Sequence, residues 1–62
     1  MRVVRDGPMV ILPRPDGKVI DVFTGKGWNR HSVFEVNGDG RLRPVAGLDL
    51  STQEFQFLKS KI

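Results

Sequence analysis

The sequence of 62 residues has no cysteine and no tyrosine, and it contains one histidine and one tryptophan. Without cysteine the fold cannot be held by disulfides, and a single histidine cannot complete a structural zinc site. Long apolar runs are also missing: none exceeds about five residues, whereas a membrane-spanning helix needs about 20. We therefore expect a cytoplasmic protein that has no membrane contact, no metal and no cofactor.

The chain is too short for more than one domain, because domains rarely have fewer than about 50 residues. We predict that residues 1–62 form a single small domain. A chain of this length buries only about 60% of its unfolded surface, so a homo-oligomer or a partner chain is the remaining source of stability. The net charge of +3 favours anionic partners. So short a chain can hardly enclose a substrate cleft, and we do not expect an enzyme.

Turn sequences such as Pro15-Asp16-Gly17 and Asn37-Gly38-Asp39-Gly40 separate short runs rich in Val, Ile and Phe. These runs predict strands at about 2–5, 9–13, 18–23, 32–36 and 41–46. Their regular spacing indicates a small curled antiparallel sheet or an SH3-like barrel of four to five strands. The second run is apolar throughout, which predicts a strand covered on both faces. Pro44 makes the fifth strand an edge strand or ends it early.

The last part of the chain changes to a helical period. Ser51 and Glu54 are spaced as a capping box, in which each side chain bonds to the other residue's backbone N–H. Phe55, Leu58 and Ile62 then recur at helical spacing. We predict a helix at about 52–61 that docks on the sheet, because an isolated helix of this length is not stable in water. The expected fold class is therefore β-rich α+β.

Several motifs that resemble known sites are incomplete. Lys26 is followed by Gly27, whereas a phosphate-binding P-loop has Ser or Thr at this place. The Asn- and Asp-rich turn resembles half of a calcium loop, but Ala46 stands where a bidentate carboxylate is needed. His31 and Ser32 are neighbours, and neighbouring side chains on a strand point to opposite faces. None of these segments therefore predicts catalysis or metal binding.

The segment from residue 24 to residue 31 combines cations, polar groups and the single tryptophan without any acid. Cations that contact phosphates and an aromatic ring that stacks on bases are typical of nucleic-acid binding. We therefore predict that the following residues bind nucleic acid: Lys26, Trp28, Asn29, Arg30 and His31. In the alternative, Trp28 closes one end of the core and the cations are ordinary solvated charges.

Arg41 and Arg43 are two residues apart on a predicted strand, so they project from the same face. We include both in the predicted nucleic-acid site, because they extend the basic surface if their strand lies beside the one that begins near His31. In the alternative, they form ion pairs with Glu35 or Asp39 across the hairpin.

Phe57 lies about 200° around the predicted helix from Phe55. A helix that docks by one stripe leaves Phe57 exposed, and we therefore predict it as a protein-contact residue. In the alternative, the helix is wedged so that both of its sides are buried.

The leading functional hypothesis is a small basic, non-catalytic nucleic-acid-binding module without strong sequence specificity, since no recognition helix is present. The alternative is a protein-interaction module. It would be either a homodimer or a small phage or mobile-element regulator that docks on a larger protein through the C-terminal helix. The size of the chain fits such an accessory protein.

Overall fold

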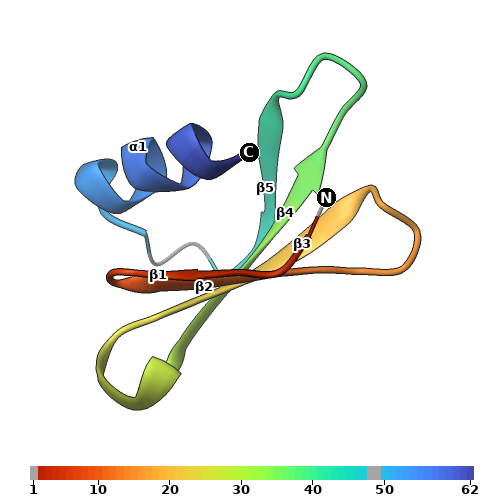
Figure 1. Ribbon diagram of the computed structural model, residues 1–62. Coiled ribbons are helices and arrows are strands. Elements are labelled where there is room, and N and C mark those ends of the chain that lie inside the picture. Colours follow the sequence, from red (N-terminus) through yellow and green to blue (C-terminus); the bar gives the residue numbers. More distant parts are fainter. Residues whose placement is uncertain (1, 48–49) are drawn as a thin grey trace.

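The computed structural model describes residues 2–47 and 50–62, which form a five-stranded antiparallel sheet and one C-terminal helix (Figure 1). The strands follow one another in the order β1-β2-β3-β4-β5, each hydrogen-bonded to the next. The elements are β1 (Val4–Asp6), β2 (Met9–Pro13), β3 (Val19–Thr24), the single 3-10 turn η1 (Lys26–Trp28), β4 (Arg30–Val36), β5 (Leu42–Ala46) and α1 (Thr52–Lys61). The predicted α+β class is confirmed.

The sheet curls but does not close into a barrel. In the described part of the chain, β1 pairs only with β2 and β5 pairs only with β4. The end of α1 lies between the two outer strands, because Ile62 lines one hollow with Leu42 of β5 and another with Val4 of β1. The helix end therefore stands where the two edges would have to meet, and the SH3-like barrel does not form.

The helix and the second strand have the predicted bounds, whereas the other four strands differ from the prediction by one or two residues at one end or both. The first strand extends to Asp6, not Arg5, because Asp6 pairs with Met9 across a turn of only two residues. The fourth strand begins at Arg30, two residues earlier than predicted, because Arg30 pairs with Thr24. Pro44 lies within β5, which is an edge strand. Proline is accommodated in an edge strand where its nitrogen, which has no hydrogen to donate, points away from the neighbouring strand, here β4.

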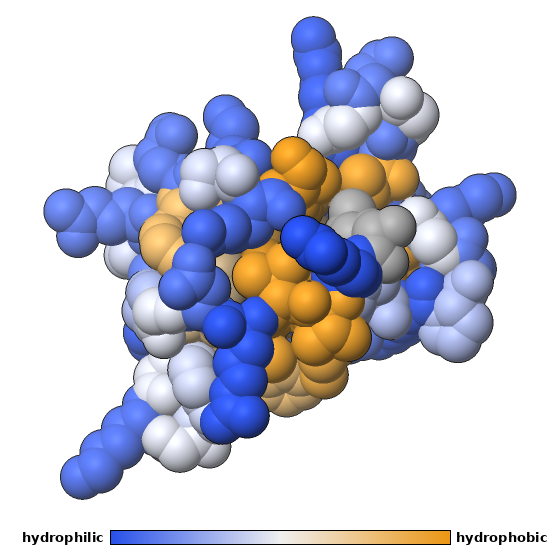
Figure 2. All heavy atoms as spheres, viewed as in Figure 1, coloured by the Kyte–Doolittle hydropathy of each residue, from blue (hydrophilic) through white to orange (hydrophobic). Residues whose placement is uncertain are grey.

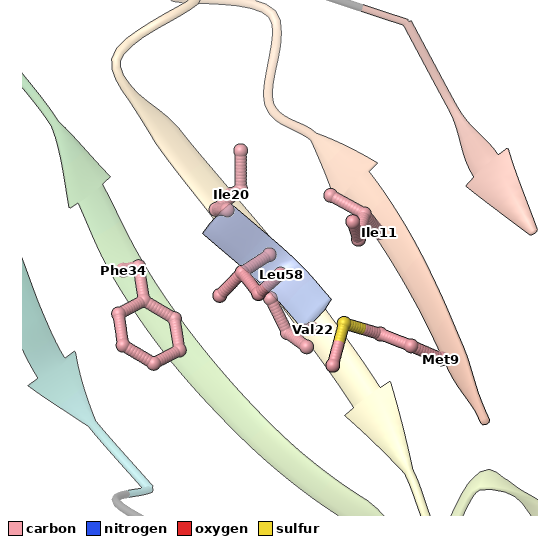
Figure 3. Close-up of a cluster of buried hydrophobic side chains, with 6 residues drawn as sticks. All are labelled: Met9, Ile11, Ile20, Val22, Phe34 and Leu58. Atoms are coloured by element: carbon pink, nitrogen blue, oxygen red, sulfur yellow. The ribbon is translucent and has the colours of Figure 1, made fainter. Parts of the chain in front are cut away.

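The core lies between α1 and one face of the sheet. Figure 3 shows Leu58 of the helix at the centre of the cluster, with Phe34 on one side of it and the β2 side chains on the other. The buried cluster consists of Met9, Ile11, Ile20, Val22, Phe34 and Leu58. Alternation along the strands brings these residues to one face.

The opposite face of the sheet carries no helix, and we call it the open face. The open face contains the side chains that alternate along the strands with the core residues. Leu12, which lies on this face, is 38% exposed. The prediction that the second strand is covered on both faces is therefore wrong. One ten-residue helix covers only one face of the sheet, and no other helix or strand of the described residues lies over the opposite face, where Val33 is nevertheless buried among its neighbours. In Figure 2, apolar atoms reach the surface in the middle of the molecule, and hydrophilic side chains project around them.

The helix is fixed at its start and along both flanks. The Glu54 N–H donates to Ser51 Oγ at 3.1 Å and the Ser51 N–H donates to Glu54 Oε1 at 2.9 Å, which completes the predicted capping box. On one flank, the Phe55 ring lies 5.9 Å from that of Phe34 between centroids. On the other, Phe57 is half-buried against the core and the turn at Gly7. The curl of the sheet brings this turn to the second flank, so the expectation that Phe57 is left exposed does not hold.

We expect Leu58→Ala to lower the free energy of unfolding by about 2–5 kcal/mol, because it leaves a cavity at the centre of the core. This is a large part of the roughly 3–9 kcal/mol expected for a domain of this size. The matched control, Leu12→Ala on the open face, should cost less than about 1 kcal/mol. Urea unfolding followed by circular dichroism measures both, and equal losses would contradict this docking of the helix.

Candidate nucleic-acid interface

The loop between β3 and β4 holds three of the predicted site residues. The Trp28 N–H donates to the Gly25 carbonyl at 3.0 Å, which closes the turn η1. Trp28 has a φ of 55°, an uncommon conformation for a residue other than glycine, and its side chain is 36% exposed. Lys26 is exposed and has no ion pair in the described residues. The loop therefore presents one aromatic ring and one free cation at the surface.

Asn29 and Arg30 fold back against the start of the loop. A Cβ added at Gly25, whose φ is 83°, would lie 2.8 Å from Asn29 Oδ1, so only glycine fits there. Arg30 Nη2 donates to Glu54 Oε2 of α1 at 3.0 Å. The Ser51 N–H, more than Arg30, lowers the pKa of Glu54 below its ordinary value. Arg30 thus links the start of β4 to the helix and is not a free charge.

His31 lies on the open face, where its ring stacks on that of Phe23. The ring centroids are 4.5 Å apart and the planes are inclined by 9°. His31 Nε2 donates to Asp21 Oδ1 at 2.8 Å, since a carboxylate only accepts. Phe23 was not among the predicted site residues. Strand alternation places Phe23 on this face, but only the β3–β4 register places it opposite His31.

Asp21 connects this aromatic pair to Arg14. Arg14 Nε and Nη2 donate to the two carboxylate oxygens at 2.9 and 3.0 Å. These bonds, together with the one from His31, lower the pKa of Asp21 to about 2, although partial burial acts in the opposite direction. The same carboxylate raises the pKa of Arg14. The open face therefore carries a connected cluster of Arg14, Asp21, His31 and Phe23.

The two predicted arginines of the last hairpin do not join the loop. Arg43 Nε and Nη2 donate to Glu35 Oε1 at 3.1 and 3.0 Å, which is the cross-strand pair given as the alternative. Arg41 lies in the turn that follows β4, whereas Lys26 lies in the loop that precedes it (Figure 1). The seven residues of β4 separate these positions by roughly 20 Å. Arg41 and Lys26 are therefore not parts of one basic patch.

Neither a metal site nor a membrane helix is found in residues 2–47 and 50–62. No three His, Cys, Asp or Glu side chains there come together in a way that could hold a metal ion. The ten-residue α1 is too short to cross a bilayer, and no other α-helix occurs in those residues.

The Asp21 cluster predicts a specific pH dependence of stability. The carboxyl has a pKa of about 2 in the folded state, below the ordinary value of 3.8, so its ionised form stabilises the fold. This contribution, about 2 kcal/mol at most, is complete above about pH 4 and is lost as the pH falls toward about 2. Asp21→Asn should therefore lower the free energy of unfolding at neutral pH, and its difference from the wild type should shrink between these two pH values.

Urea unfolding at a series of pH values measures this difference. The matched control is Asp39→Asn, at an exposed carboxyl in the last hairpin that has no ion pair in the described structure. It should keep the wild-type pH profile. If the difference in free energy of unfolding between the wild type and Asp21→Asn stays constant down to about pH 2, the role given to the Asp21 carboxylate is contradicted.

No family model, curated protein or solved structure matches this chain.

Proposed function

We propose that this protein binds single-stranded nucleic acid on the open face and the adjoining β3–β4 loop. The observation that carries the proposal is the stacked Phe23–His31 pair, which lies on an uncovered sheet face beside a loop with an exposed tryptophan and a free lysine. Phe23 and His31 are the last open-face positions before this loop on β3 and β4. The Phe23–His31 pair and the β3–β4 loop are therefore proposed to form one continuous binding surface.

Stacking is the main interaction in this proposal. Aromatic rings on an open sheet or groove bind unpaired bases, because every base presents a flat apolar face to them. The bases of a duplex are already stacked on one another, and such rings do not reach them. The preferred ligand is therefore a single strand, with one base on the Phe23–His31 pair and a neighbouring base on Trp28.

The charges of the open face suit a polyanion. Its two carboxylates, Asp21 and Glu35, are each bonded to an arginine, so neither adds an uncompensated negative charge. Arg5 pairs with Val10 in the ladder, which places it on the same face, and it has no ion pair among the described residues. Arg5 and Lys26 are thus cations that phosphates can engage.

The expected binding is weakly selective for sequence and involves no chemical step. Stacking tolerates all bases, and lysine and arginine contacts to phosphates carry no sequence information. This corresponds to a non-catalytic binding module whose affinity falls steeply with salt.

Trp28 fluorescence tests the proposal directly, because it is the only tryptophan and no tyrosine contributes. A single-stranded oligonucleotide should quench it, and a duplex of the same sequence should bind more weakly. Phe23→Leu should weaken single-strand binding by about 1–3 kcal/mol, the value of one stacked base. Lys26→Ala should reduce the slope of log affinity against log salt by about 0.7.

Two matched control variants distinguish these losses of binding from losses caused by partial unfolding of the protein. Phe57→Leu makes the same change at a phenylalanine of α1, on the other side of the sheet, and Lys18→Ala removes an exposed cation at the opposite end of β3. Both should bind as the wild type does. Unchanged affinity of Phe23→Leu, or duplex binding as tight as single-strand binding, would overturn the proposal.

A further inference from the structure

A groove runs along the side of α1 that faces β5, and we call it the α1–β5 groove. It consists of two hollows that share Phe55, with volumes of about 350 and 360 Å³. The first is apolar and is lined mainly by Phe34, Pro44, Leu50 and Phe55. The second continues along β5 and the last turns of the helix, and it contains the side chains of Arg41 and Lys59.

The two cations of the groove belong to no ion pair in the part of the chain that the structure describes. Arg41 and Lys59 are exposed, and neither forms an ion pair in the described residues, whereas Arg14, Arg30 and Arg43 all do. Of the described residues that line the two hollows, none is Asp or Glu. The Lys59 ammonium lies 5.7 Å from the centre of the Phe55 ring, at the junction of the hollows. An apolar surface therefore leads directly to a concentration of positive charge.

From this arrangement we propose that the α1–β5 groove binds a segment of a partner protein in which an aliphatic or aromatic side chain stands close to a carboxylate. The apolar side chain enters the hollow beside Phe34 and Leu50, and the carboxylate binds Arg41 and Lys59. Arginine suits this role because its guanidinium can bond a carboxylate through two N–H groups. The occupant is a peptide segment because neither hollow is a closed cavity, so a side chain can enter it while the backbone to which it is attached runs outside.

The groove recognises side chains and does not extend the sheet. A peptide that added to the edge of β5 would need backbone donors from that strand, and Pro44 has none. The groove and the open face lie on opposite sides of the sheet, because Phe34 belongs to the core side and His31 to the other. Both surfaces can therefore be occupied at once, so this site is additional to the proposed function and independent of it.

Selection from a display library of random short peptides on the immobilised full chain tests this proposal. Enriched peptides should combine a large apolar residue with Asp or Glu within a few positions. A labelled copy of the most enriched peptide then serves as the probe, with binding measured by fluorescence anisotropy. Amide shifts on adding this probe should be largest around Leu50, Phe55 and Arg41.

Two charge-reversal variants with equal net charge provide the decisive comparison. Arg41→Glu combined with Lys59→Glu should weaken binding of the probe about tenfold or more. Arg5→Glu combined with Lys18→Glu changes two unpaired cations outside the groove and should retain the wild-type affinity. Enriched peptides that lack acidic residues, no enrichment at all, equal losses in both variants, or amide shifts on the open face would each overturn the proposal. Single-strand binding should fall less in the Arg41/Lys59 variant than in the Arg5/Lys18 variant of equal net charge, because only the latter changes a cation of the open face, and this tests the proposed function separately.

Discussion

The insertion of Leu58 into the concave face of the sheet is the contact on which the rest of the molecule depends. It is the only fully buried side chain that α1 contributes, and it lies in one buried cluster with core residues of three strands (Figure 3). A ten-residue helix is not stable alone, and a small sheet without a covered face is not stable either, so each requires the other. Because the described residues 2–47 and 50–62 contain one α-helix, burial on one side leaves the other side of the sheet without a covering layer. The candidate binding surface follows directly from this limit.

Local signals in the sequence were sufficient for most of the fold. The Ser51–Glu54 capping box marked the start of α1, and the glycine-containing turns separated the five strands. The apolar run from Met9 to Leu12 gave the wrong prediction that this strand is covered on both faces. Hydrophobicity shows what a strand can bury but not whether a second layer exists to cover it. The barrel alternative failed for a related reason. Closure depends on whether the last turn of α1 lies between the two outer strands, which no local pattern encodes.

The candidate site was less predictable, because its geometry depends on contacts between distant parts of the chain. The β3–β4 loop was recognised from its composition, but the Arg30–Glu54 ion pair joins residues 24 positions apart, and composition gives no sign of it. The Arg43–Glu35 pair spans one hairpin and could therefore be foreseen as an alternative. Phe23 becomes a site residue only when the register places it opposite His31. Pairing across the sheet thus determines which of the candidate side chains act together.

The two outer strands have a consequence for the behaviour of the protein at high concentration. An unpaired strand edge is a template on which copies of a chain can assemble into fibrils. Here β1 has only three residues, and β5 contains Pro44 and a register shift opposite Val33 and Phe34. Such short, irregular edges offer too few regular backbone bonds for a second sheet to grow from them. The chain can therefore leave one sheet face without a covering layer and still present no edge that promotes aggregation.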